Sequence, residues 1–215
     1  MSNNARISRD QVIGVVLAGG QGRRLGFVNK PLIDLGGKPV LAHILKKMSL
    51  QLPEIIINAN AAHDEYQHFG LDIVRDELEG FLGPLSGVLT ALDWAAMSRS
   101  GISHVLSFPG DAPFVPHDLA EKLIEAVNNA EAGDKPCLAR AVSGGRAHPV
   151  VGLWPVSIRA ELRDKVVNDD VRKIDLFTAD YPMQDVSFEG VPDPFFNINT
   201  DEDVALAKRI LKGAS

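Results

Sequence analysis

The chain has 215 residues, of which 45% are hydrophobic, and this content excludes an intrinsically disordered protein. The 22 basic and 28 acidic residues leave a formal net charge of −6, which argues against general binding to nucleic acid or to anionic membranes. The single cysteine, Cys137, excludes an internal disulfide and a cysteine-cluster zinc site. No apolar stretch is long enough for a signal peptide or a membrane span, so we expect a cytoplasmic protein.

Short apolar runs alternate with helical periods along the first 130 residues. Continuous apolar runs predict buried strands over 12–17, 55–57 and 104–108, with a shorter strand over 72–75. Apolar residues at helical spacing predict helices over 41–48 and 85–92, and a further helix is expected over 61–69. Asp118 and Glu121 resemble a capping box that starts another helix. This alternation indicates an α/β fold: a mostly parallel, Rossmann-like sheet with helices on both faces.

The remaining residues predict two strands, over 136–142 and 149–154, joined by a turn at 143–145. Helices are expected over 155–165 and 170–178. Thr200 is expected to cap a last helix, whose first turn is acidic and whose last turn is basic. No linker interrupts the chain, and we therefore expect a single domain over residues 1–215.

Glycines and basic residues gather where the first predicted strand ends. Residues 17–26 read LAGGQGRRLG, and Lys30 follows shortly after. Glycine lets a backbone approach a ligand closely, and successive backbone N–H groups can bind an anion. Arg23, Arg24 and Lys30 add three cations to an otherwise acidic chain. The segment therefore predicts a polyphosphate site at the carboxyl end of the sheet, and an ordinary glycine-rich turn is the alternative.

Two familiar phosphate-binding motifs do not fit this segment. No Gly-Lys-Ser or Gly-Lys-Thr follows at the Walker A spacing. A dinucleotide fingerprint requires a helix directly after the glycines and an acid at the end of the second strand. Here Pro31 and Pro39 interrupt any regular helix, and the second strand ends at Asn58. A nicotinamide-dependent oxidoreductase is therefore disfavoured.

Several short motifs follow one another along nearly the whole chain: LAGG at 17–20, KPL at 30–32, GKPVL at 37–41, NAN at 58–60, VRD at 74–76, GPLSG at 83–87, PGDAPF at 109–114, RAHP at 146–149 and NINT at 197–200. In these motifs the chain resembles the nucleotidyltransferase superfamily, and within it the molybdenum cofactor guanylyltransferases, also called molybdopterin-guanine dinucleotide synthases. The double glycine points to the guanylyl-transferring branch. Asn29 departs from the pattern, because the family usually has an acid before the lysine.

The resemblance implies transfer of GMP from GTP to the terminal phosphate of molybdopterin, with release of pyrophosphate. The attacking phosphate is already ionised near neutral pH, because its second pKa is about 6, so no general base is needed. Mg²⁺ is the implied cofactor, with Asp111 as its ligand, and Lys30, Asp111 and Arg24 are the implied catalytic residues. Nucleotide contacts are implied for Leu17, Ala18, Gly19, Gly20, Lys30, Asn58, Asp76, Gly83 and Asp111.

The acceptor side carries the second set of expected contacts. Arg146, His148 and Asn199 are expected to bind the anionic molybdopterin, and Arg140, Arg172 and Lys173 are further basic candidates. The domain then divides into a nucleotide-binding half, 1–130, and an acceptor-binding half, 131–215. Other proteins of molybdenum cofactor biosynthesis and the enzymes that accept the product are the protein partners to expect, without nucleic acid or membrane.

Three other functions stay open from the sequence. Within the same class they are cytidylyl transfer to molybdopterin and transfer to a sugar phosphate. In a different class, the chain could bind GTP or a cofactor without turning it over. The presence of Lys30 and Asp111 favours catalysis over such binding alone.

Overall fold

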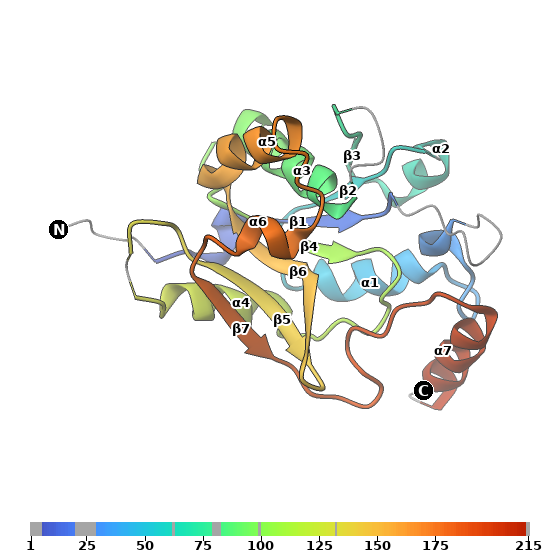
Figure 1. Cartoon of the computed structure of the whole chain (residues 1–215). Coiled ribbons are helices and arrows are strands. Elements are labelled where there is room, and N and C mark those ends of the chain that lie inside the picture. The colour runs from blue at the N-terminus through green and yellow to red at the C-terminus, as the bar shows by residue number, and fades with distance from the viewer. Residues whose placement is uncertain are drawn as a thin grey trace.

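The computed structural model describes residues 6–19, 29–61, 63–78, 83–98, 100–131 and 133–213. Within them, a seven-stranded sheet forms the centre of the molecule, with strand order β3-β2-β1-β4-β6-β5-β7 (Figure 1). Parallel pairs join β1 (Val12–Leu17) to β2 (Ile55–Asn58) and β4 (His104–Pro109), β2 to β3 (Ile73–Val74), and β5 (Leu138–Ser143) to β7 (Met183–Ser187). β6 (Arg146–Pro155) runs antiparallel to both β4 and β5. The predicted α/β class with a mostly parallel sheet is confirmed.

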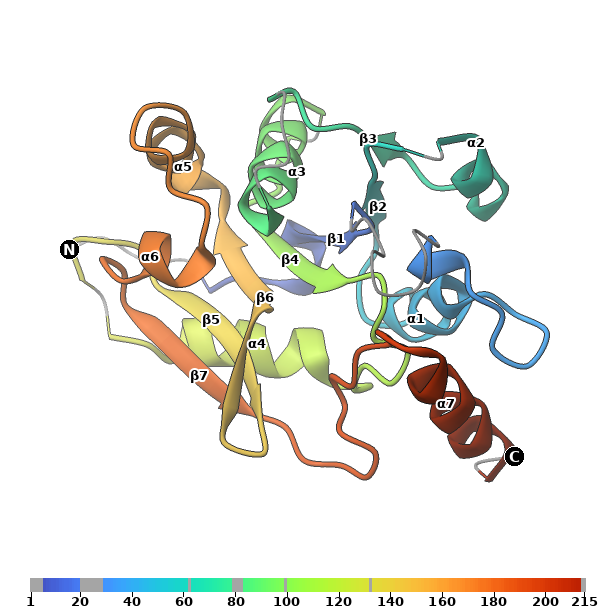
Figure 2. The same cartoon turned by 45° about the vertical axis from the view of Figure 1, so that its right-hand side comes forward.

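Helices cover both faces of this sheet, as Figure 2 shows. α1 (Val40–Met48) and α4 (Leu119–Asn128) pack on one face. α3 (Pro84–Ser98), α5 (Arg159–Val167) and α6 (Ile174–Thr178) pack on the other. The central strand β1 is apolar throughout because its alternate residues enter two different cores: Val12 and Val16 face the first, Ile13 and Val15 the second. α2 (His63–Tyr66) and the last helix, α7 (Asp201–Gly213), complete the fold.

The structure corrects several predicted boundaries. The helix expected over 61–69 is divided into α2 and a 3-10 turn, Gln67–Phe69. The helix expected over 170–178 begins only at Ile174, because Asp170 has a left-handed backbone with φ 53°. β6 begins at Arg146 rather than at residue 149, since Gly144 and Gly145 make the two-residue turn with φ 54° and 76°. β7 was not predicted, because this edge strand is short and mostly polar.

The two predicted helix caps have opposite outcomes. Thr200 caps α7 as predicted: the backbone N–H of Asp203 donates to Thr200 Oγ1 at 3.2 Å. The Asp203 carboxylate accepts hydrogen bonds in return from the backbone N–H groups of Asn199 and Thr200, both at 2.9 Å. The capping box predicted at Asp118 is wrong, because its side chain makes no cap hydrogen bond and pairs with Lys122 at 2.8 Å instead.

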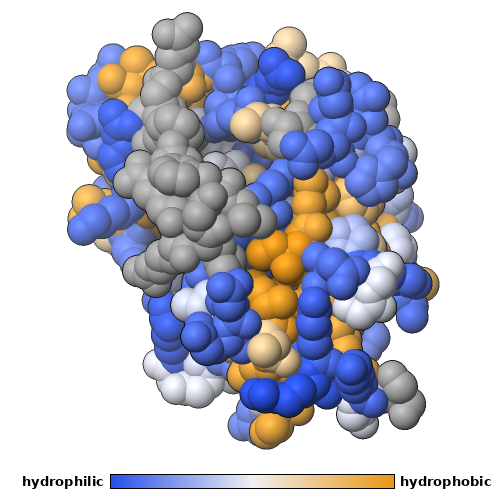
Figure 3. Space-filling model, turned by 90° about the vertical axis from the view of Figure 1, so that its right-hand side faces the viewer, coloured by the Kyte–Doolittle hydropathy of each residue, from blue (hydrophilic) through white to orange (hydrophobic). Residues whose placement is uncertain are grey.

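A strip of apolar surface lies between hydrophilic residues on the side of the molecule that carries α1 and α7 (Figure 3). A groove of about 650 Å³ lies there, with Leu35, Ala42 and Leu211 among its apolar lining residues. Lysines from both helices and the preceding turn surround it: Lys38, Lys46, Lys208 and Lys212. Among the described residues, no helix is long and apolar enough to cross a membrane.

His104, at the start of β4, makes the stability depend on pH. Burial lowers its pKa to about 4, whereas the unfolded chain titrates near 6.5. Because the pKa of His104 is lower in the folded state, the unfolded state binds the proton first as pH falls. The contribution of His104 to the unfolding free energy is therefore fully present above pH 6.5 and is lost as pH falls towards 4. Between about pH 7.5 and about pH 4.5, we expect wild type to lose about 2–3 kcal/mol more unfolding free energy than His104→Gln in urea titrations. An equal loss in both proteins would contradict this assignment.

Candidate active site at the carboxyl edge of the sheet

The ends of four strands meet at one edge of the sheet. Leu17, the last residue of β1, is in register with Asn58 of β2 and with Pro109 of β4. Asn58 is in turn in register with Val74 of β3. The backbone N–H of Gly110 donates to the Leu17 carbonyl at 3.1 Å, so the chain segments that leave β1 and β4 stay together. Open α/β sheets bind their ligands at this edge.

Three predicted site residues meet beside these strand ends. Lys30 Nζ lies 3.0 Å from Asp111 Oδ2 and donates to Asn199 Oδ1 at 2.5 Å. These partners are 81 and 169 residues away along the chain. The backbone N–H of Ile198 donates to the Asp111 carbonyl at 2.9 Å, which holds the segment before α7 against the loop after β4. The side chains of Lys30 and Asp111 are only 16% and 20% exposed, so the pair is screened little by solvent.

Close packing fixes the backbone around Lys30. The lysine opens a 3-10 turn, Lys30–Leu32, in which Pro31 is buried. A Cβ atom on Gly110 would lie 2.9 Å from Pro31 Cγ, so only glycine lets this turn sit against the loop after β4. Asn29, before the lysine, accepts a hydrogen bond from the Tyr66 hydroxyl at 2.6 Å. Burial raises the pKa of Tyr66 to about 12, so the hydroxyl keeps its proton and donates it to the amide oxygen of Asn29.

A second polar cluster surrounds Asp76, after β3. Oδ1 of its carboxylate accepts hydrogen bonds from Asn58 at 2.8 Å and from Thr90 of α3 at 3.0 Å. Oδ2 accepts from Asn60 at 2.8 Å, and the Asn60 oxygen accepts from the Asp76 backbone N–H at 2.8 Å. The cluster ties β2, β3 and α3 together and holds the carboxylate in one orientation. A contact between Asp76 or Asn58 and a base remains a prediction. The three donors leave the carboxylate, which has about four acceptor positions, little capacity for further hydrogen bonds.

The first turn of α3 lies directly against this cluster. A Cβ atom on Gly87 would overlap Asn58 Oδ1 and would lie 2.8 Å from Leu17 Cδ2. The helix backbone therefore contacts two residues that were predicted to bind nucleotide. Gly83, before the helix, has φ 75°, and a Cβ there would lie 3.4 Å from the carbonyl oxygen of Arg172. The amino end of a helix carries partial positive charge, which favours an anionic ligand at this place.

Comparison with known proteins agrees with this arrangement. The family model described as the MobA-like NTP transferase domain matches residues 14–179. The chain belongs to this family.

The MobA-like assignment has support along the whole chain. The chain is 46% identical, over 198 residues, to a protein of Nitrobacter hamburgensis named molybdenum cofactor guanylyltransferase, covering 92% of this chain and 93% of that protein. The crystal structure of molybdopterin-guanine dinucleotide biosynthesis protein A from Archaeoglobus fulgidus has a similar fold, with a TM-score of 0.74 at 22% identity, over 94% of this chain and 99% of that one. The manganese complex of Rv0371C from Mycobacterium tuberculosis has a TM-score of 0.63 at 17% identity, over 93% and 98%. The resemblance inferred from the motifs is confirmed.

In this MobA-like chain, two of the residues predicted to bind the acceptor, Arg146 and His148, lie on the antiparallel strand β6. Because β6 runs antiparallel to β4, its first residues extend past the carboxyl end of β4 as a hairpin with β5 (Figure 2). Arg146 is exposed at the start of this strand. His148, two residues later, contacts Ser143 and the Phe195 ring. Asn199 lies apart from these residues, in the cluster with Lys30.

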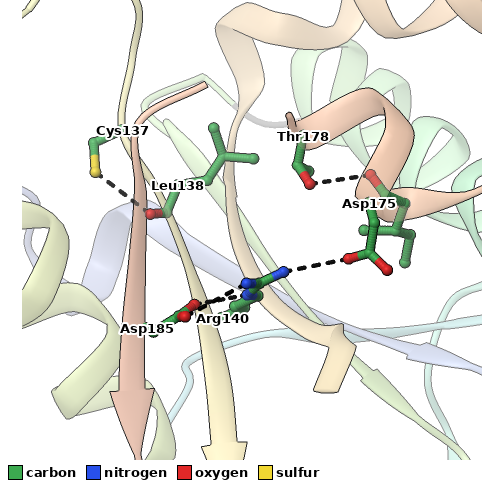
Figure 4. Close-up of polar contacts among 7 residues, drawn as sticks. Cys137, Leu138, Arg140, Asp175, Thr178 and Asp185 are labelled. Carbon is green, nitrogen blue, oxygen red and sulfur yellow. Dashed lines mark hydrogen bonds and ion pairs between the residues drawn. The ribbon is translucent and has the colours of Figure 1, made fainter. Parts of the chain in front are cut away.

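Arg140 is engaged by protein carboxylates, as Figure 4 shows. Its Nε lies 2.7 Å from Asp185 of β7, and its Nη1 lies 3.2 Å from Asp175 of α6. The hydrogen bond with Asp185 raises the pKa of the guanidinium. Arg140 therefore joins β5, β7 and α6 and is not free to bind an anionic acceptor. In the same view the half-buried Cys137 thiol donates to the Leu138 carbonyl at 3.4 Å.

Gly20 and Arg24, both predicted site residues, lie outside the described part of the chain. Ala18 and Gly19 follow the end of β1, as the phosphate-site prediction requires. Thr90 and Ser143 contact the predicted site residues Asp76 and His148 but were not predicted themselves. Tyr66 and Asp193, which contact Asn29 and Ser143, were not predicted either. Each stands alone among ordinary neighbours in the sequence, and no motif marks it.

Proposed function

We propose that the chain transfers GMP from GTP to the terminal phosphate of molybdopterin, releasing pyrophosphate and forming molybdopterin guanine dinucleotide. Family membership and the 46% identity to a molybdenum cofactor guanylyltransferase support this activity. The observation that supports it most directly is the cluster of Lys30, Asp111 and Asn199, in which one ammonium group contacts two side-chain oxygens at the carboxyl edge of the sheet. Other proteins of molybdenum cofactor biosynthesis and the product-accepting enzymes remain predicted partners.

The donor set of the cluster fits Mg²⁺. Asp111 and Asn199 already direct two hard oxygen atoms at one positive group, the Lys30 ammonium. Among the described residues, no three His, Cys, Asp or Glu side chains gather into a metal site of their own. A cation held by one carboxylate and an amide oxygen would complete its shell with water and phosphate oxygens, as Mg²⁺ does in nucleotide sites. When bound, Mg²⁺ would offset charge on the triphosphate and help align the reacting phosphates.

The side chains themselves supply position and charge. Among the contacts of the described residues, Lys30 engages Oδ2 of Asp111, which leaves Oδ1 to hold the cation. Lys30, as a compact positive charge, stabilises the departing pyrophosphate. No residue needs to remove a proton from the nucleophile, because the acceptor phosphate is already ionised near neutral pH. Asn58, Asn60 and Thr90 leave the oriented carboxylate of Asp76 about one acceptor position, which would suit a single hydrogen bond from a guanine N–H donor.

Pyrophosphate release tests this function. The purified chain is assayed with GTP, CTP, ATP or UTP, with and without molybdopterin, in Mg²⁺, Mn²⁺ or EDTA. Of the four nucleotides, we expect only GTP to release pyrophosphate. Release should also require both molybdopterin and a divalent cation. Release from CTP instead would overturn the guanine assignment. GTP binding without release under the complete conditions would indicate a non-catalytic binding protein.

A further inference from the structure

A cavity of about 430 Å³ lies between the tip of the β5–β6 hairpin and residues 187–194. Ser143 from the hairpin and Asp193 from the opposite segment are among the residues that line it. The hairpin is the part of the sheet that extends beyond β4, so this cavity adjoins the acceptor side of the candidate active site. Nothing in the catalytic cluster accounts for the polar side chains found here.

Ser143 and Asp193, from the cavity lining, form a hydrogen-bond chain with His148, which lies next to the lining through its contact with Ser143. Ser143 Oγ donates to Asp193 Oδ1 at 2.8 Å and lies 2.7 Å from His148 Nε2. Ser143 is only 5% exposed, so its partners are protein groups. Asp193 Oδ1 also accepts from the backbone N–H of Phe195 at 2.8 Å, which fixes the carboxylate. The Phe195 ring packs against the imidazole, with centroids 4.8 Å apart.

This chain determines the tautomer of His148. A serine hydroxyl has one proton, and an ionised carboxylate can only accept, so the Ser143 proton points to Asp193. Ser143 Oγ must then accept from His148, which places the imidazole proton on Nε2. Nδ1 keeps its lone pair, and no hydrogen bond to it occurs among the described residues. Burial lowers the pKa of His148, and Arg146 lowers it further against the opposing effect of Asp193, so the ring is neutral at neutral pH.

We propose that Ser143 and Asp193 are positioning residues, which hold His148 in the Nε2–H form so that Nδ1 accepts a hydrogen bond from a ring N–H or amino group of the pterin. A lone pair on Nδ1 repels phosphate oxygens, which are acceptors as well, and it attracts the N–H donors of a heterocycle. His148 therefore hydrogen-bonds the heterocycle of the acceptor and not its phosphate, in contrast to the anion contact expected from the sequence. The identity of the acceptor rests on the proposed function.

Histidine NMR tests the tautomer independently of catalysis. In protein labelled with ¹⁵N-histidine, two-bond ¹⁵N–¹H correlations distinguish the two tautomers and the imidazolium, and His148→Gln identifies the signal among the six histidines. We expect the Nε2–H form in wild type and in Ser143→Thr, which keeps a hydroxyl. Ser143→Ala and Asp193→Ala should give a mixture of tautomers, whereas Asp193→Asn, which keeps a carbonyl oxygen, should not. A wild-type signal from Nδ1–H or imidazolium at neutral pH would overturn the proposal.

Kinetics tests the contact with the acceptor. For Ser143→Ala and Asp193→Ala we expect the KM for molybdopterin to rise roughly two- to threefold, because only the Nε2–H fraction of the tautomer mixture can accept the hydrogen bond, with the KM for GTP unchanged. Ser187→Ala, in the lining of the same cavity but outside the hydrogen-bond chain, is the matched control. An unchanged molybdopterin KM in Ser143→Ala, with the tautomer altered, would refute the pterin contact. If the wild-type protein does not use molybdopterin, the proposed function is wrong. The NMR experiment then still tests whether Ser143 and Asp193 determine the tautomer of His148.

Discussion

Asp111→Asn will lower the rate of pyrophosphate release by roughly 10³-fold, a loss of the size seen when a preorganised charge-stabilising group is removed from an active site. Asparagine preserves the shape of the side chain but loses the negative charge that would hold the divalent cation. The fold should survive, because Lys30 keeps its hydrogen bond to Asn199. We expect a loss of only about 1–2 kcal/mol in unfolding free energy for this partly exposed pair.

Asp118→Asn is the matched control for this variant. Asp118 also pairs with a lysine, Lys122 at 2.8 Å, but on an exposed surface at the start of α4. Single-turnover assays and urea titrations of both variants separate loss of chemistry from loss of structure. Full activity of Asp111→Asn would remove this residue from the reaction and with it the proposed metal site.

Lys30→Met should have two effects of opposite sign. The rate should fall by roughly 10²–10³-fold, since the departing pyrophosphate loses its nearest described cation. Binding of Mn²⁺ to the nucleotide-free protein should instead become roughly tenfold tighter, because Lys30 no longer neutralises Asp111 at 3.0 Å. Electron paramagnetic resonance titration of free Mn²⁺ measures the second effect directly.

Lys122→Met provides the comparison for this experiment, because it removes a lysine from a carboxylate outside the site. It should change neither the rate nor the Mn²⁺ affinity. A Lys30→Met protein that binds Mn²⁺ more weakly than wild type would show that the lysine and the metal ion do not compete for the Asp111 carboxylate.

The fold could be predicted where the sequence pattern has one structural solution. A run of apolar residues such as 12–17 is typical of a strand buried on both faces of a parallel sheet, and β1 lies in such a position. β7 lacked any such signal, since an edge strand needs no apolar run. Asp118 and Thr200 have similar capping patterns in sequence, but only the second forms a cap, because Lys122 competes for the first.

The candidate site shows the same division. Motif resemblance selected Lys30, Asp111 and Asn199 separately, but the contacts among them depend on the packing of three distant segments. Asp76 was predicted as a base-reading carboxylate, and the sequence gives no sign that Asn60 and Thr90 would occupy its oxygens. From the sequence, His148 was expected to bind an anion. The position of its proton depends on contacts with Ser143 and Asp193, which are 50 residues apart, and these contacts could not be predicted from the sequence.

The cap of α7 has a practical consequence for anyone who attaches this protein to a surface or a fusion partner. Asn199 and Thr200 are neighbours, and one carboxylate, from Asp203, anchors both of their backbone amides. A force applied to the carboxy-terminal helix would therefore reach Asn199 and, through its hydrogen bond, Lys30 of the proposed site. Tethering through the amino end, which enters β1 from the opposite edge of the sheet, spares that linkage (Figure 1).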